Sequence, residues 1–248
     1  MKATKVIVSL TSHTKERLKN LPYFLYHSVI KHNFDYVKIV LTIFKDDVKN
    51  LSPELIKMRD TGLIEIIVAD KDLKCHLKYF YSMKKYRTLP IITIDDDSIY
   101  PKNMIQELLK QHQSNPNVII ARSARLIEPD KSYAYWFTVN NGVCGIQWTN
   151  HFDEVRSDLN AEGYGGVLYP PDILKVNDTL IPEILKFPRA DDIYLMVLEK
   201  RLKIKIIVPR YDGAKLDVCT RPEHSICTMP DNIKMIDELI KEYREELR

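Results

Sequence analysis

The chain has 248 residues, of which 45% are hydrophobic and 29% are charged, and its formal net charge is +3. These totals are ordinary for a globular protein of one large domain or two closely packed halves. They exclude a protein organised around a basic nucleic-acid-binding tract, because no such tract dominates the sequence. The mild positive charge suits an anionic substrate and allows loose contact with an anionic membrane face.

Targeting signals and disulfides are not expected from the sequence. No apolar run approaches the roughly 20 residues that a membrane-spanning helix needs. The first residues, Met1 to Val8, predict the entry to a strand rather than a signal peptide. Four cysteines are scattered without a CxxC spacing: Cys75, Cys144, Cys219 and Cys227. We therefore expect reduced thiols in a cytoplasmic protein.

Strands and helices are predicted to alternate along the first half of the chain. Runs of β-branched and aliphatic residues predict strands, and apolar residues at helical spacing predict the helices between them. Strands are expected at 6–10, 37–44, 64–69, 91–94 and 118–122, and helices at 18–29, 53–62, 72–86 and from beyond 101 to about 115. Such alternation is typical of an α/β fold with a mostly parallel central sheet flanked by helices.

A polar turn follows the first strand, over Thr11 to Arg17. Hydroxyl groups and backbone N–H groups at such a strand-to-helix turn can face a nucleotide. The alternative is simple N-capping of the helix by Ser12 or Thr14.

Three aspartates, Asp95, Asp96 and Asp97, follow directly on the short apolar strand at 91–94. Three like charges at the end of a buried strand are costly unless a positive group lies beside them. Carboxylate oxygens are the ligands that Mg²⁺ or Mn²⁺ prefers, and open α/β sheets bind ligands at the carboxyl ends of their strands. The triplet therefore predicts a divalent metal that could hold a diphosphate. The alternative is an acidic loop or a helix N-terminus favoured by negative charge.

The second half of the chain is predicted to be more irregular, and it packs onto the first without a flexible linker. Three of the seven glycines lie within 162–171, which indicates a tight turn or a backbone close to a ligand. Asp191 and Asp192 begin a predicted helix, where the alternative to a chemical role is N-capping by one of them, and the two roles can coexist. A final amphipathic helix over 233–247 is expected to pack onto the domain or onto a second subunit.

Three features together resemble a nucleotide-sugar-dependent glycosyltransferase of the GT-A fold. They are the DxD-type motif within Thr93–Pro101, the glycine-rich turn within Gly163–Pro171, and the acidic pair within Ala190–Leu195. The resemblance covers roughly Val6 to His224. Within the family, the chain looks most similar to bacterial enzymes of surface-polysaccharide or lipooligosaccharide assembly. It implies one GT-A domain over 1–248, with a nucleotide-binding half (1–125), an acceptor-binding half (126–230) and a C-terminal helix (231–248).

The resemblance also implies roles for residues at matching positions. A Mn²⁺ or Mg²⁺ ion would be held by Asp97, Asp95 and, late in the chain, His224. The donor, most often a UDP-sugar, would be contacted by a larger set: Thr11, Ser12, Arg17, Asp70, Lys78, Asp95, Asp96, Gly165 and Gly166. Asp192 or Asp191 matches the general base of inverting members. Which of the two acts stays open, because the pair departs from the commoner Glu-Asp.

We therefore expect a metal-dependent enzyme that transfers a sugar from a nucleoside diphosphate to a hydroxyl of a saccharide or lipid-linked acceptor. We expect a cytoplasmic protein. This expectation is compatible with peripheral contact at the inner face of the membrane and with formation of a homo-oligomer. A divalent ion would stabilise the charge on the departing diphosphate, and a carboxylate would take the acceptor proton. A nucleotidyltransferase is disfavoured, because residues 11–17 contain no glycine. A nucleotide- or sugar-binding protein without catalysis is a further alternative.

Overall fold

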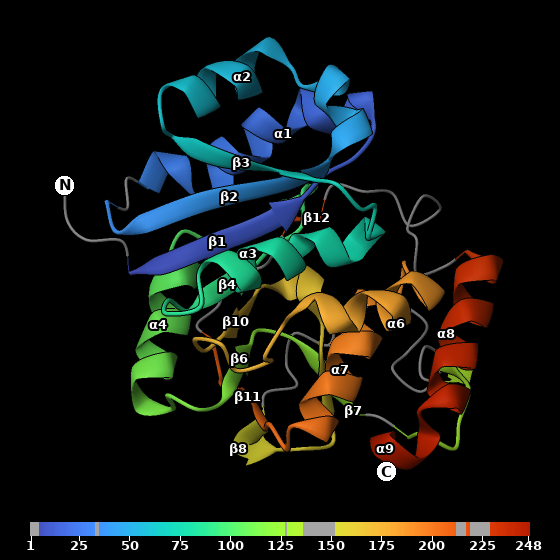
Figure 1. Cartoon of the computed structure of the whole chain (residues 1–248). Helices are drawn as coiled ribbons and strands as arrows, with labels where there is room; N and C mark the ends of the chain where they lie inside the picture. The colour runs from blue at the N-terminus through green and yellow to red at the C-terminus, as the bar shows by residue number, and fades with distance from the viewer. Residues whose placement is uncertain (1–4, 33–34, 127, 136–151, 212–216, 219–228) are drawn as a thin grey trace.

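The computed structural model describes residues 5–32, 35–126, 128–135, 152–211, 217–218 and 229–248. Its centre is an eight-stranded sheet with the order β3-β2-β1-β4-β10-β6-β11-β8 (Figure 1). The strands are β1 Val6–Thr11, β2 Val37–Phe44, β3 Ile64–Ala69, β4 Ile91–Thr93, β6 Ile119–Ala121, β8 Phe152–Arg156, β10 Val167–Tyr169 and β11 Ile206–Val208. Two short ladders join β5 Ser98–Ile99 to β12 Asp217–Val218, and β7 Ala124–Leu126 to β9 Leu159–Ala161.

Helices connect these strands in the described part of the chain. The α-helices are α1 Lys15–Ser28, α2 Pro53–Asp60, α3 Phe80–Lys85, α4 Met104–Ser114, α6 Ile181–Lys186, α7 Asp191–Arg201, α8 Pro230–Glu242 and α9 Arg244–Leu247. The 3₁₀ turns are η1 Ile30–His32, η2 Lys45–Asn50, η3 Lys74–Lys78, η4 Gly163–Gly165 and η5 Asp178–Leu180. The predicted α/β class is confirmed.

The sheet is parallel where strands and helices alternate and mixed beyond that point. β3, β2, β1 and β4 pair in parallel, as the alternation of the first half predicts. β10 then lies antiparallel between β4 and β6, although it follows both in the sequence. Strands from both halves of the chain therefore form one sheet.

The sheet carries one apolar core on each face. Successive residues of a strand point to opposite sides, so Val8 packs with residues of α1, α2 and α4, while Ile7 packs with residues of η3, α3 and α7. Figure 1 shows α1 and α2 on one side of β1–β3 and α3 on the other. Both faces are covered by helices, as predicted from the sequence.

The helix predicted over 72–86 is instead divided into η3 and α3. The backbone leaves helical geometry at Tyr79, whose φ is −121° and ψ −33°. The carbonyl of Lys78, just before the break, accepts a hydrogen bond of 2.6 Å from Oγ of Ser9 in β1. The four residues predicted to face inward are all buried: Leu73, Leu77, Phe80 and Met83. The break holds Lys78 against the central strand.

Helix starts follow the predictions in part. Oγ of Ser52 caps α2, with Pro53 in its first turn, as predicted. Thr14, rather than Ser12, caps α1. The N-cap position of α7 is Ala190, without a side-chain cap, so the alternative of capping by an aspartate is wrong. Side-chain capping therefore does not explain why Asp191 and Asp192 lie at the start of α7.

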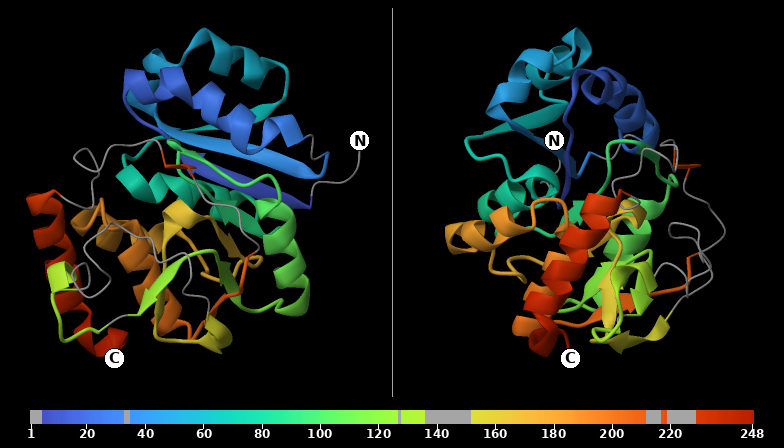
Figure 2. Two further views of the ribbon diagram at one scale, coloured as in Figure 1. Left: turned by 180° about the vertical axis from the view of Figure 1, so that it is seen from behind. Right: turned by 90° about the vertical axis from the view of Figure 1, so that its right-hand side faces the viewer.

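The C-terminal helix packs onto the domain. The buried face of α8, which includes Ile236 and Leu239, lies in the same core cluster as Tyr194 and Leu198 of α7. Figure 2 shows α8, in red, beside the orange α7. No helix in the described ranges has both the length and the apolar character needed to cross a membrane.

We predict that Leu41→Ala lowers the free energy of unfolding by about 2–5 kcal/mol, because Leu41 is fully buried in the middle of β2. Urea denaturation of purified protein measures this loss. The matched control is Leu185→Ala, at a side chain that is 51% exposed on α6, which should change stability by no more than about 0.5 kcal/mol. Equal effects of the two variants would contradict this packing.

Candidate functional site

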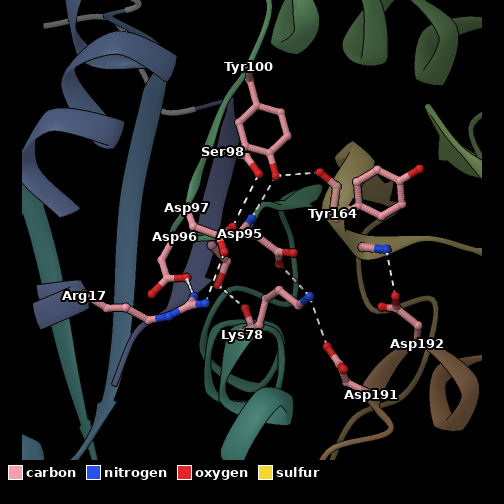
Figure 3. Close-up of polar contacts among 12 residues, drawn as sticks. Arg17, Lys78, Asp95, Asp96, Asp97, Ser98, Tyr100, Tyr164, Asp191 and Asp192 are labelled. Carbon is pink, nitrogen blue, oxygen red and sulfur yellow. Dashed lines mark hydrogen bonds and ion pairs between the residues drawn. The ribbon is translucent and has the colours of Figure 1, made fainter. Parts of the chain in front are cut away.

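The acidic triplet lies at the carboxyl end of β4, next to the parallel strand β1 (Figure 3). Asp96 accepts hydrogen bonds of 2.5 Å from Oγ of Ser12 and 2.5 Å from Nη1 of Arg17. Nη2 of Arg17 also donates to Asp97, at 3.1 Å. The turn after β1 and the triplet thus form one cluster, and nucleotide contacts by Ser12 and Arg17 stay a prediction.

A buried lysine connects this cluster to the acidic pair on α7. Nζ of Lys78 lies 2.9 Å from Oδ1 of Asp95 and 3.0 Å from Oδ2 of Asp191. The Lys78 side chain is only 9% exposed. Figure 3 shows it between the two carboxylates. One ammonium group therefore joins the end of β4 to the first residue of α7.

The second aspartate of the pair is held by the glycine-rich turn. Oδ2 of Asp192 accepts the N–H of Gly163 at 3.0 Å, and its main-chain oxygen accepts from Nδ2 of Asn160 at 2.8 Å. A Cβ atom at Gly163 would lie 2.7 Å from Oδ1 of Asp192 and 2.7 Å from Nζ of Lys78. Only glycine allows the turn to approach both charged groups this closely.

The two other glycines of the turn are explained by packing. A Cβ at Gly165 would lie 3.1 Å from Cβ of Ser123. Gly166 has a φ of +91°, and a Cβ there would lie 2.8 Å from Sδ of Met104. The neighbouring Glu162 accepts a hydrogen bond from Ser123, which fixes the turn to the end of β6. Donor contacts by Gly165 and Gly166 stay a prediction.

The buried Tyr100 joins the triplet to the same turn. Its hydroxyl oxygen accepts the N–H of Asp95 at 2.9 Å, and the hydroxyl donates to the carbonyl oxygen of Tyr164 at 2.8 Å. Sequence reasoning did not single out Tyr100 or Gly163. The available signal is that a buried tyrosine needs a partner for its hydroxyl, and Tyr100 lies three residues after Asp97.

Other predicted site residues lie apart from this centre. Thr11, the last residue of β1, donates from Oγ1 to the carbonyl oxygen of Thr42 at 2.8 Å. Asp70 is exposed just after β3, and no hydrogen bond within the described residues joins it to the triplet. The proposed metal ligand His224 falls outside the described residues, and so do three of the four cysteines: Cys144, Cys219 and Cys227. Cys75 is a free thiol, and burial raises its pKa well above the usual range.

The two aspartates of α7 differ in their affinity for protons. Burial raises the pKa of Asp192 to about 7, and the adjacent Asp191 carboxylate adds to this, while Lys78 opposes it. Burial would also raise the pKa of Asp191, but its ion pair with Lys78 holds the value below the ordinary one. Asp191 therefore stays ionised, and Asp192 is the carboxylate that can exchange a proton near neutral pH.

The donor set fits a divalent ion that is shared with a diphosphate. No group of three or more His, Cys, Asp or Glu side chains gathers as a metal site in the ranges that the structure describes. Asp95 and Asp97 are nevertheless partly exposed, at 30% and 21%. One or two carboxylates suffice for Mg²⁺ when phosphate oxygens and water complete its shell. These residues fit that mode of binding.

Solved structures resemble this chain in fold at low sequence identity. No protein-family model matches the chain, and no curated protein sequence matches it. Residues 1–349 of TarS from S. aureus in complex with UDP are 14% identical, with a TM-score of 0.55, over 98% of this chain and 70% of that one. The UDP-GlcNAc complex of TarS gives 13% identity and a TM-score of 0.57, over 98% and 66%.

A third structure is the mannosyltransferase PcManGT from Pyrobaculum calidifontis with GDP-Man and Mn²⁺. It is 10% identical, with a TM-score of 0.48, over 84% of this chain and 55% of that one. TarS is more similar in fold to this chain than PcManGT is. The chain therefore has a GT-A fold like that of TarS, as the resemblance in the sequence implies.

We predict that Asp192→Asn is more stable than the parent at pH 8 but not at pH 4. In the parent, the raised pKa means that the folded state binds the proton more tightly than the unfolded state. This tighter proton binding at Asp192 therefore stabilises the folded parent below about pH 4. The stabilisation is lost as the pH rises to about 7. The variant should gain about 1–4 kcal/mol across this range, as measured by urea denaturation at each pH.

The control is Asp158→Asn, because Arg156 lowers the pKa of Asp158. This variant should lose stability relative to the parent as the pH rises, which is the opposite sign. A flat difference between Asp192→Asn and the parent from pH 4 to pH 8 would contradict the raised pKa.

Proposed function

We propose that this chain is a metal-dependent glycosyltransferase, which transfers a sugar from a nucleoside diphosphate to a hydroxyl of a saccharide or lipid-linked acceptor. One observation carries the proposal. The carboxylates at the end of β4 and at the start of α7 are gathered around one lysine, on a GT-A fold. UDP and UDP-GlcNAc are present in the TarS complexes, which supports a UDP-sugar as the donor.

The donor side of the site is assigned to the first half of the chain. Asp97 and Asp95 would hold Mn²⁺ or Mg²⁺, with His224 as a further ligand. The ion would stabilise the negative charge on the departing diphosphate. Arg17 is 32% exposed beside the triplet, so its guanidinium can also meet a phosphate. The other nucleotide contacts that the resemblance implies are, beside the triplet, Ser12 and Asp96, at the turn, Gly165 and Gly166, and, apart from this centre, Thr11 and Asp70.

The base is assigned to Asp192. Its carboxylate takes the proton from the acceptor hydroxyl while the acceptor oxygen forms a bond to the anomeric carbon. The bond from that carbon to the diphosphate oxygen breaks, and its electron pair leaves with the nucleoside diphosphate. A pKa of about 7 suits this proton transfer at neutral pH. The N–H of Gly163 orients the carboxylate by donating to Oδ2.

We propose the following organisation around this chemistry. Residues 1–125 bind the donor and residues 126–230 bind the acceptor within a single domain over 1–248. The reaction belongs to the assembly of a bacterial surface polysaccharide, at the cytoplasmic face of the membrane. A screen of nucleotide sugars for thermal stabilisation with Mn²⁺, followed by transfer assays with saccharide and lipid-linked acceptors, tests these assignments.

Titration calorimetry with UDP and GDP in the presence of Mn²⁺, followed by a donor hydrolysis assay, tests the class of protein. Binding with hydrolysis or transfer supports a glycosyltransferase. Binding without hydrolysis, and without transfer to any acceptor, would identify a nucleotide- or sugar-binding protein instead. Nucleotidyl transfer from a nucleoside triphosphate would favour a nucleotidyltransferase.

We predict that Asp97→Ala abolishes Mn²⁺-dependent binding of UDP, because the ion loses its principal carboxylate. The fold should persist, since Asp97 lies at the end of a strand and is partly exposed. Calorimetry measures binding, and circular dichroism measures folding. Asp178→Ala, at an exposed carboxylate on η5, is the control and should bind UDP like the parent. If Asp97→Ala binds UDP with Mn²⁺ as tightly as the parent, the metal assignment is wrong.

We predict that Asp192→Asn lowers kcat by about 10²–10⁴-fold, because asparagine cannot take the acceptor proton. Donor binding should stay close to that of the parent, since the amide oxygen can still accept the N–H of Gly163. A transfer assay and calorimetry together test both parts. Full turnover by Asp192→Asn, combined with an inactive Asp191→Asn, would move the base to Asp191.

A further inference from the structure

The Lys78 ammonium group is directed toward two carboxylates of the protein. Two of its contacts are the carboxylates of Asp95 and Asp191, at 2.9 and 3.0 Å, and the side chain is 9% exposed. The contact with Asp95 is a hydrogen bond and the contact with Asp191 is an ion pair, so both carboxylates are neutralised by this one buried ammonium group. Arg17, at 32% exposed, is the more accessible cation beside the triplet. Lys78 is therefore poorly placed for the phosphate contact that the sequence resemblance implies.

The backbone of Lys78 is fixed as well as its ammonium group. Its carbonyl oxygen accepts a hydrogen bond of 2.6 Å from Oγ of Ser9, which also lies 2.6 Å from Oγ of Ser82. All of these groups are buried. Because a buried ammonium is strongly unfavourable without its carboxylates, β1, β4 and α7 are held in register through this one residue.

The Lys78 ammonium group lies close to the proposed base, Asp192. The hydrogen bond to the Asp192 carboxylate nevertheless comes from the N–H of Gly163. Nζ of Lys78 and Oδ1 of Asp192 are each 2.7 Å from the point that a Cβ at Gly163 would occupy. Asp192 also interacts with Asp191 on its own helix and with Asp95 after β4. It accepts the N–H of Gly163 in η4. Glu199, two turns along α7, is the remaining buried carboxyl that interacts with it. Lys78 is the cation within this set.

We propose that Lys78 is a positioning residue of the transfer reaction. Its ammonium group occupies Asp191 in an ion pair and fixes α7 against the end of β4, and this leaves Asp192 as the carboxylate that takes the proton. The inference rests on the proposed glycosyltransferase function. In this role Lys78 does not contact the donor phosphates directly, although direct contact is the role that the sequence resemblance implies.

Three variants test this role: Lys78→Met, Asp191→Asn and the double variant. Lys78→Met nearly keeps the length of the side chain but removes the cation from both Asp95 and Asp191, and it leaves Asp191 as an unpaired buried charge. We expect kcat to fall about 10²-fold, because the proposed base is no longer held in place. The dissociation constant for UDP with Mn²⁺ should rise by no more than about tenfold, because Lys78 pairs with the proposed ion ligand Asp95 but does not itself contact the phosphates. The acid limb of the pH–rate profile should move to higher pH, because a cation that lowers the pKa of Asp192 is gone.

The double variant should recover activity relative to Lys78→Met. Asparagine at 191 removes the more buried of the two carboxylate charges that the methionine leaves without a cation, so we expect about a tenfold gain in kcat. Lys78→Arg keeps the positive charge and should lose less activity than Lys78→Met. This variant also keeps the test valid if methionine at 78 prevents folding.

The matched control is Lys85→Met, because Lys85 pairs with Glu65 at 2.8 Å on an exposed surface. Its kcat and pH profile should equal those of the parent.

Two results would overturn the role of Lys78. A more than tenfold weaker binding of UDP by Lys78→Met, with kcat unchanged, would mean that the ammonium group contacts the phosphates. An equal loss of kcat in Lys78→Met and the double variant, with an unmoved pH profile, would mean a merely structural role. A parent without transfer from any donor contradicts the proposed function itself. An active parent whose Lys78→Met variant keeps its kcat contradicts only the inference on Lys78.

Discussion

The arrangement of the site depends on how five carboxylates are held together at one end of the sheet. Asp95, Asp96, Asp97, Asp191 and Asp192 would repel one another strongly in a partly dry environment. Two cations prevent this: Arg17 bonds to Asp96 and Asp97, and Lys78 bonds to Asp95 and Asp191. Asp192 is left with a backbone N–H as its hydrogen-bond donor, and this difference separates its chemistry from that of its neighbour.

The scaffold explains why these cations can be so close to the acids. Lys78 lies where the helical path breaks after η3, and β1 holds its carbonyl oxygen there. Gly163 lets the turn after β9 approach without a side chain in the way. Tyr100 fixes the same turn from the other side, through the backbone of Asp95 and Tyr164. The site is thus built from segments that are distant in sequence and joined by short polar contacts.

The sequence predicted the elements that depend on local pattern, and it missed features that depend on long-range contact. Periodicity located the strands of the first half, the caps of α2 and the apolar face of α8. It could not show that β10 inserts between β4 and β6, because strand pairing is not encoded in spacing. The triplet was evident as a cluster of like charges. The burial of Lys78 was not, because a lysine on a predicted helix is usually solvated.

The position of β10 has a consequence for how the protein acquires its structure. β4 and β6 come from the first half of the chain, yet each hydrogen-bonds to β10 rather than to the other. A fragment that stops near residue 125 would have two hydrophobic strands with a missing neighbour between them. The sheet can close only after the later strand has been synthesised, so the two halves should fold and unfold cooperatively, as one thermodynamic unit.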